Sequence, residues 1–246
     1  LNSSHGVAPT LAQTGLNGPS IFPITSLALR WRGASERLTW QLALFDAVPG
    51  DRDNPAQFGV HLSGREGALL IGEIGAAVPG WDKLAVGAWT YSERFAPIDD
   101  DGSAAPQRGN DGLYLIGETT LLERGERKLR AFVRLGHASA RFNPIDFYAG
   151  AGLTWHGLLP RRPDDRFGLA VAFARNSDRF RRFAAASGAP VERAETAVEL
   201  TWRAPLGSWL TLQPNLQYVR NPGMRPDLDD ALVVALRFEL NASLLD

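Results

Sequence analysis

The chain has 246 residues, of which 44% are apolar and 22% are charged, with 26 basic against 27 acidic side chains and no cysteine. A formal net charge of -1 excludes a basic nucleic-acid-binding surface, and the absence of cysteine excludes disulfides, thiolate metal sites and a cysteine nucleophile. No apolar run is long enough to form a transmembrane helix. The chain starts at Leu1 without a signal-peptide pattern, so we expect it to begin partway through a longer protein.

Alternation of apolar and polar side chains with a period of two residues is the strongest pattern in the sequence. Between residues 127 and 137, leucine, alanine and valine occupy every second position, and lysine, arginine and phenylalanine fill the positions between them. A helix would spread these charges around its circumference, whereas a strand places them all on one face. The same pattern predicts about eleven strands of roughly ten residues. They are 24–32, 37–45, 67–77, 81–91, 110–122, 127–138, 145–156, 166–176, 193–203, 208–219 and 230–240.

The connections between these strands tend to alternate between short and long. The short connections are 33–36, 78–80, 123–126, 157–165 and 204–207. The longer ones are 46–66, 92–109, 177–192 and 220–229, with 138–144 as a compact exception. Short turns at one end and long loops at the other predict an all-β, antiparallel, up-and-down transmembrane β-barrel of the bacterial outer membrane.

The tryptophans support a membrane location. Six of the seven lie near a short turn, and only Trp89 lies toward the long loops, where most of the neighbouring aromatic residues are tyrosine and phenylalanine. Amphipathic rings prefer the membrane–water interface, so this placement predicts two aromatic belts. The alternative is a soluble antiparallel sheet with one wet face, which also alternates.

Three stretches of sequence carry longer motifs. The first is LNSSHG at 1–6, followed by GLNGPSIFP at 15–23, and the second is DAVPGDRDNP at 46–55. The third lies within 195–223 and includes LTWRAPL, WLTLQP and NPG. Together they resemble the carbohydrate-selective porins of the OprB type over the whole chain.

That resemblance implies a water-filled barrel of about sixteen strands, of which about eleven are present here. We therefore expect residues 1–246 to form one partial barrel domain that lacks roughly five N-terminal strands and a signal peptide. The resemblance also implies passive diffusion of sugars and a monomer without a cofactor or metal. The expected surroundings are outer-membrane lipid and lipopolysaccharide, and the expected folding partner is the barrel-assembly machinery.

Polar positions on the strands predict the lining of the pore. Charges of both signs share this face, and such a lining suits a neutral, hydroxyl-rich solute better than an ion. Arginine offers a planar fork to adjacent hydroxyls, and aromatic rings can stack on the apolar face of a sugar. For any single charge, an ion pair that holds the wall together is the alternative. The candidate pore-lining residues are Arg30, Glu73, Lys83, Trp89, Glu118, Arg130, Arg134, Tyr148, Glu199 and Arg237.

The segment 1–23 is the candidate for a constriction. Counting strands back from the C-terminus places it on the outer side of the barrel, and the resemblance implies that outer loops fold inward. Asn2, His5 and Asn17 are the candidate sugar contacts, although such side chains also fix loops by local hydrogen bonds.

Other functions remain open at this point. A general, unselective porin is the nearest alternative, and the long loops could serve as an adhesin or phage-receptor surface. An outer-membrane enzyme would need a nucleophile and base, for which His61 and His137 each have a serine two residues later, without an elbow motif. Acidic runs at 51–54 and 99–101 could bind calcium, but solvated loop tips are the better explanation of both.

Overall fold

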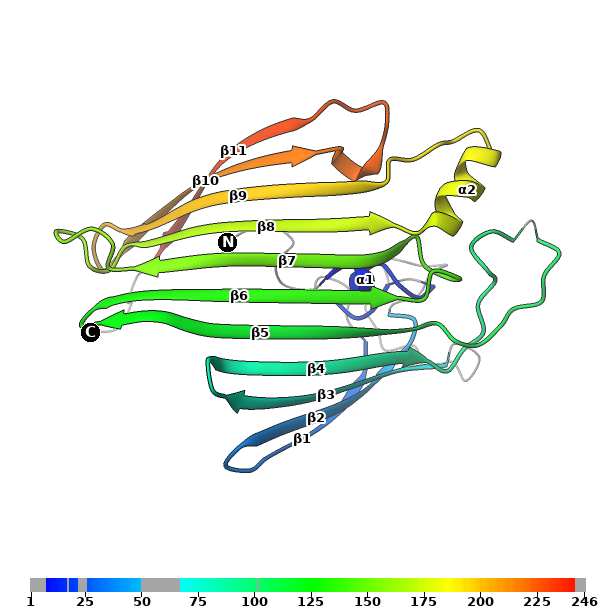
Figure 1. Ribbon diagram of the computed structural model, residues 1–246, viewed down its shortest axis with the longest axis horizontal. Coiled ribbons are helices and arrows are strands. Elements are labelled where there is room, and N and C mark those ends of the chain that lie inside the picture. The colour runs from blue at the N-terminus through cyan, green and yellow to red at the C-terminus, as the bar shows by residue number, and fades with distance from the viewer. Residues whose placement is uncertain (1–7, 17, 22–25, 50–66, 101, 242–246) are drawn as a thin grey trace.

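Eleven strands form one antiparallel sheet in which every strand pairs with its neighbours in sequence (Figure 1). The computed structural model describes residues 8–16, 18–21, 26–49, 67–100 and 102–241. The strands are β1 (Ala28–Ala34), β2 (Leu38–Asp46), β3 (Ala68–Val78), β4 (Trp81–Tyr91), β5 (Asp111–Arg124), β6 (Arg127–Ala138), β7 (Ile145–His156), β8 (Arg166–Asn176), β9 (Ala194–Pro205), β10 (Leu210–Arg220) and β11 (Ala231–Leu240).

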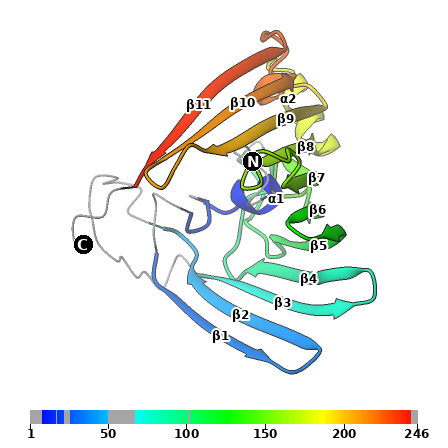
Figure 2. The same ribbon diagram turned by 90° about the vertical axis from the view of Figure 1, so that its left-hand side faces the viewer.

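The sheet is curved and open. Its order runs from β1 to β11 without a pairing between these two strands, and Figure 2 shows them at the two margins of a trough. The expected all-β, up-and-down partial barrel is therefore confirmed. Each predicted strand coincides with an observed one, and the largest difference at an end is four residues, at the start of β1.

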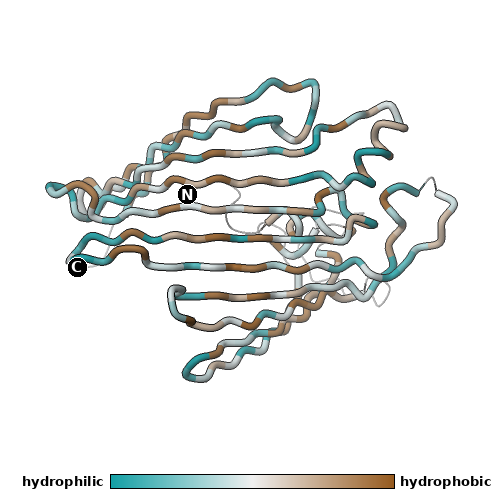
Figure 3. The backbone as a smooth tube through the Cα atoms, in the orientation of Figure 1, coloured by the Kyte–Doolittle hydropathy of each residue, from teal (hydrophilic) through white to brown (hydrophobic). Residues whose placement is uncertain are grey.

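The two faces of the sheet differ in chemistry. Large apolar side chains are exposed on the convex face of strand after strand, for example Ile74, Leu200 and Leu236. The concave face carries the polar side chains described below, while the turns are mostly hydrophilic (Figure 3). A sheet with an exposed apolar convex face is suited to contact with lipid hydrocarbon.

Trp202 shows how aromatic side chains are held at the short-turn end. Its ring stacks on Phe167 at 5.7 Å between centroids, and its indole N–H donates to Asp165 Oδ2 at 2.8 Å. Burial raises the pKa of Asp165, but hydrogen bonds from Arg162 and Trp202 outweigh that effect and hold the pKa below its ordinary value. This end of β9 thus carries a ring with one apolar face and one hydrogen-bonded edge, as expected at a membrane interface.

Among the described residues, three short helices lie in segments where the sequence predicts no strand: α1 (Pro9–Ala12), α2 (Asp178–Ala186) and a 3₁₀ turn (Pro222–Met224). Ser177 caps α2 by accepting the N–H of Phe180 at 3.1 Å. Arg179 on α2 pairs with Asp99 of the loop after β4 at 3.0 Å, so α2 ties two outer loops together. In the described part of the chain, no helix has the length and apolar character needed to cross a lipid bilayer.

A pair of neighbouring positions on β11 tests the assignment of the two faces. Leu236 is 61% exposed on the convex face, and Ala235 lies on the concave face. We expect Leu236→Arg to lower the free energy of unfolding in lipid vesicles by about 2–4 kcal/mol, because a charge near the bilayer centre loses its hydration. Ala235→Arg is the matched control and should change it by less than about 1 kcal/mol. Equal effects at both positions would contradict the assignment.

Candidate functional site

The concave face of the sheet is the candidate site. All ten candidate pore-lining residues lie on this face by strand register. For example, direct pairing across the sheet links Lys83 to Glu118 and then Glu118 to Phe132. The period-two pattern thus assigned their side correctly, but it did not show how they contact one another.

A hydrogen-bonded network centred on Glu73 crosses β1 to β5. Glu73 Oε1 accepts from Gln41 Nε2 at 3.1 Å, and Glu73 Oε2 accepts from the hydroxyl of Tyr114 at 3.1 Å. Arg30 donates to Gln41 Oε1 at 2.5 Å, and Lys83 Nζ lies 3.7 Å from Glu73 Oε1. Gln41 and Tyr114 were not among the candidates, although they fall on the same alternating positions as those that were.

A second network links β9 and β10. Glu199 is fully buried and accepts from Asn215 Nδ2 at 2.8 Å, and Gln217 Nε2 donates to Asn215 Oδ1 at 2.8 Å. Nearby, Gln213 Nε2 donates to Thr201 Oγ1 at 3.1 Å. Burial is tolerated here because each of these polar groups has a hydrogen-bonding partner.

Between the two networks, charged side chains surround a cavity of about 360 Å³ on β4 to β7. Lys83, Glu118, Arg130 and Arg134 contribute charges of both signs to its lining. The guanidinium of Arg134 lies over the ring of Phe132, 5.6 Å from its centroid. Six of the ten candidates are therefore brought into two neighbouring places, this cavity and the Glu73 network.

Toward the long loops the concave face becomes apolar. Trp89 is 3% exposed and packs edge-on to Tyr91, which in turn packs edge-on to Phe95. Leu11 of α1 packs against this cluster. Trp89 thus lies on the predicted face but beneath other side chains.

Glycines on the concave face allow aromatic rings to lie flat against the wall. A Cβ at Gly112 would overlap the ring of Trp89. A Cβ at Gly87 would likewise overlap the ring of Tyr114. The glycines therefore keep bulky rings close to the sheet and leave more of the trough open.

Segment 8–16 lies inside the trough, with α1 against β6 and β7 (Figure 2). Thr10 is 2% exposed, and its Oγ1 occupies the place that a Cβ on Gly136 would need. Thr14 Oγ1 forms a 3.1 Å hydrogen bond with the hydroxyl of Tyr91. These contacts fix a segment whose inward position was expected only from the family resemblance.

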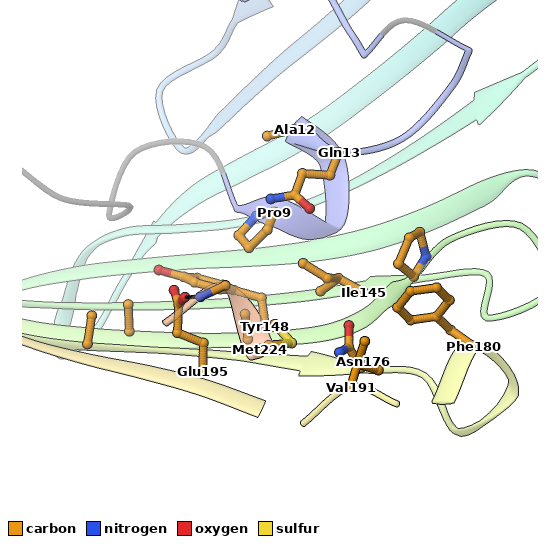
Figure 4. Close-up of a pocket in the computed structure, with 15 residues that line it drawn as sticks. Pro9, Ala12, Gln13, Ile145, Tyr148, Asn176, Phe180, Val191, Glu195 and Met224 are labelled. Atoms are coloured by element: carbon orange, nitrogen blue, oxygen red, sulfur yellow. Dashed lines mark hydrogen bonds between the residues drawn. The ribbon is translucent and has the colours of Figure 1, made fainter. Parts of the chain in front are cut away.

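A cavity of about 360 Å³ separates α1 from β7, β8 and β9. Figure 4 shows Gln13 and Pro9 facing Tyr148 and Glu195 across it, with Met224 beside Tyr148. Glu195 accepts the backbone N–H of Gly223 at 2.5 Å. The candidates Asn2, His5 and Asn17 lie outside the described residues, so their contacts to a sugar remain a prediction.

Of the residues considered for an enzyme or a calcium site, those in the described part of the chain are exposed or form contacts with other protein groups. His137 is exposed on the convex face at the end of β6, and His61 lies outside the described residues. Asp99 pairs with Arg179, and Asp100 accepts the backbone N–H groups of Ser103 and Ala104. Within the described ranges, no three metal-binding side chains gather closely enough to hold an ion.

The sequence of this chain is similar to those of known porins. The family model for carbohydrate-selective porins of the OprB family matches residues 1–241. Porin B of Pseudomonas aeruginosa is 26% identical over 232 residues, covering 81% of this chain and 51% of Porin B. Porin AaxA of Chlamydia muridarum is 30% identical over 113 residues, covering 46% of this chain and 23% of AaxA. The chain therefore spans about half the length of Porin B and less of AaxA.

Solved structures show the same fold. The high-pH structure of Pseudomonas putida OprB superposes with a TM-score of 0.76 at 24% identity, over 89% of this chain and 59% of that one. The low-pH structure gives a TM-score of 0.55 at 19% identity, over 87% and 54% of the two chains.

The contact between Thr10 and Gly136 tests how α1 is held. We expect Gly136→Ala to displace α1, because the new Cβ overlaps Thr10 Oγ1 and the buried threonine has little room to rotate. The measurement is hydrogen exchange of the amides of residues 11–14, which should speed up by about tenfold or more.

The double variant Thr10→Ala with Gly136→Ala is the control. Without Oγ1, the nearest atom of residue 10 to the new Cβ is its own Cβ at 3.4 Å, so slow exchange should return. Unchanged hydrogen exchange in the Gly136→Ala variant would show that Thr10 does not hold α1 against Gly136.

Proposed function

We propose, because this chain belongs to the OprB family of carbohydrate-selective porins, that it forms the wall of a passive outer-membrane channel through which sugars diffuse. The observation that carries the proposal is the division of one sheet into an apolar convex face and a hydrogen-bonded polar concave face. Membership in a porin family supports a channel over an enzyme.

The mixed charges of the lining suit neutral sugars. Around the cavity on β4 to β7, Lys83 and Arg130 offer donors, and Glu118 offers acceptors. A ring of one sign would favour ions of the other sign, whereas paired signs leave fixed hydrogen-bonding groups for hydroxyls. The ring of Phe132 in the same cavity offers an apolar surface to the C–H face of a sugar.

The constriction is proposed to be the segment 8–16 together with the apolar cluster beneath it. This segment occupies the trough over β6 and β7, so it narrows the path that a solute would take. Gln13 and Glu195 face one another across the adjoining cavity and provide polar groups at the narrow point (Figure 4). Asn2, His5 and Asn17 are proposed as further contacts there.

The surroundings follow from the same proposal. The convex face would contact outer-membrane lipid and lipopolysaccharide, and the barrel-assembly machinery would insert the strands. We propose a monomer that needs no cofactor. Passage is driven by the concentration gradient, so binding should be weak, with a dissociation constant of about a millimolar, or roughly -4 kcal/mol.

Conductance in planar bilayers, measured on the protein expressed from its complete gene, tests this function. Glucose and maltose-type sugars should block the ion current saturably at about millimolar concentration, because bound sugar occupies the path of the ions. Current that is unaffected by sugar would instead indicate a general porin. An inserted protein that conducts no ions would contradict the channel.

One pair of variants tests the lining. Glu118→Gln should weaken the block by glucose about fivefold to tenfold, because a carboxylate accepts stronger hydrogen bonds from hydroxyls than an amide does. Glu126→Gln removes the same charge from an exposed turn and serves as the matched control. Equal block constants in the two variants would remove Glu118 from the lining.

A further inference from the structure

Basic side chains gather on the concave face at the short-turn end. Most of them lie outside the cavity of mixed charge on β4 to β7. Strand register places Lys128 directly opposite His156, His156 opposite Arg166, and Arg166 opposite Arg203. Directly paired residues have Cβ atoms about 4.5–5.5 Å apart, and like charges in such pairs repel. The direct pairing of Arg166 with Arg203 therefore costs stability unless something negative lies near the two guanidinium groups.

The acidic partners in the described part of the chain neutralise only the two ends of this row. Lys128 pairs with Glu123 at 2.7 Å, and Arg203 pairs with Glu239 at 3.2 Å. Arg166 has no ion pair among the described residues, and neither has Arg130, which lies two residues beyond Lys128 on the same face of β6.

These side chains line a cavity of about 200 Å³. Lys128, Arg130, Thr154, His156 and Arg166 surround it together with Trp155, and no carboxylate of the described residues lines it. Guanidinium and ammonium groups with a hydroxyl donor are the groups that bind phosphate and carboxylate oxygens.

The basic cavity adjoins the mixed one. Arg130 and Thr154 line both, so the two cavities share a wall. A sugar ring in the mixed cavity, with its hydroxyls facing Lys83 and Glu118, can therefore place a charged substituent in the basic cavity.

We propose that these adjoining cavities form a binding site for anionic sugars, which carry a phosphate or a carboxylate, at the short-turn mouth of the channel. The inference rests on the proposed function and names a class of solute beyond neutral sugars. Arg166 binds the anionic group together with Arg130, which spans the two cavities.

The test uses planar-bilayer conductance of the protein from its complete gene, with glucose, glucose 6-phosphate and inorganic phosphate as separate probes. Glucose 6-phosphate should block the current at about tenfold lower concentration than glucose, because it gains charge-assisted hydrogen bonds. Inorganic phosphate should raise the block constant for glucose 6-phosphate, and salt should weaken this block more than the block by glucose. A block by phosphate alone, without a gain for the sugar phosphate, would reduce the site to one for free phosphate and overturn the proposal.

Arg166→Gln is the decisive variant. It should weaken the block by glucose 6-phosphate about tenfold and leave the block by glucose within about twofold. Arg32→Gln removes one charge from the concave face of β1, outside both cavities, and controls for general electrostatics. A variant Arg166→Gln that behaves like Arg32→Gln would overturn the site.

The outcomes separate this inference from the function on which it rests. If glucose blocks the current and glucose 6-phosphate blocks it no better, the sugar channel stands and the anionic site falls. If neither sugar blocks the current, the proposed function itself fails.

Discussion

Hydrogen bonding of the backbone is the constraint on which this structure depends. A strand surrounded by hydrocarbon must satisfy its N–H and C=O groups within the sheet, because no water is available. The strands meet this demand by pairing in strict sequence order, from β1 to β11. The outer edges of β1 and β11 each carry a row of groups without a strand partner in the described part of the chain, and the same constraint requires partners for them wherever lipid surrounds the sheet.

Once the backbone is paired, the side chains have only two environments. On β6, for instance, Leu135 is exposed on the convex face while its neighbour Arg134 lies on the concave face against Phe132. Because successive side chains point to opposite faces, a one-residue shift in pairing would move every side chain of the strand to the other face. The register that makes the convex face apolar therefore also makes the concave face polar. The side-chain hydrogen bonds on the concave face give its polar groups partners within the protein.

This regularity explains why the sequence predicts the strands so well and the site only in part. Alternation shows which face of the sheet each residue occupies, so it predicted all eleven strands and the face of each pore-lining candidate. It does not report what covers that face. Trp89 and Tyr148 are buried because α1 and the outer loops pack over them, and that packing depends on contacts such as Thr10 with Gly136, which lie more than a hundred residues apart. The short helix α1 has no period of its own, whereas Ser177 followed by Asp178 was an available cap signal for α2.

The distribution of charge along the trough depends on register in the same way. The composition gives a net charge of -1, and the polar positions of the strands carry charges of both signs. Such averages predict a uniformly mixed wall. Register instead places Glu73 among donors on β2 to β5, and it brings Arg166 opposite Arg203 on the far side. A slip of one residue between β8 and β9 would remove that juxtaposition, but it would also turn Leu200 and Trp202 away from the convex face. The alternation that keeps the convex face apolar thus also fixes which charges meet, and repulsion inside the trough persists because the demands of the convex face set the register.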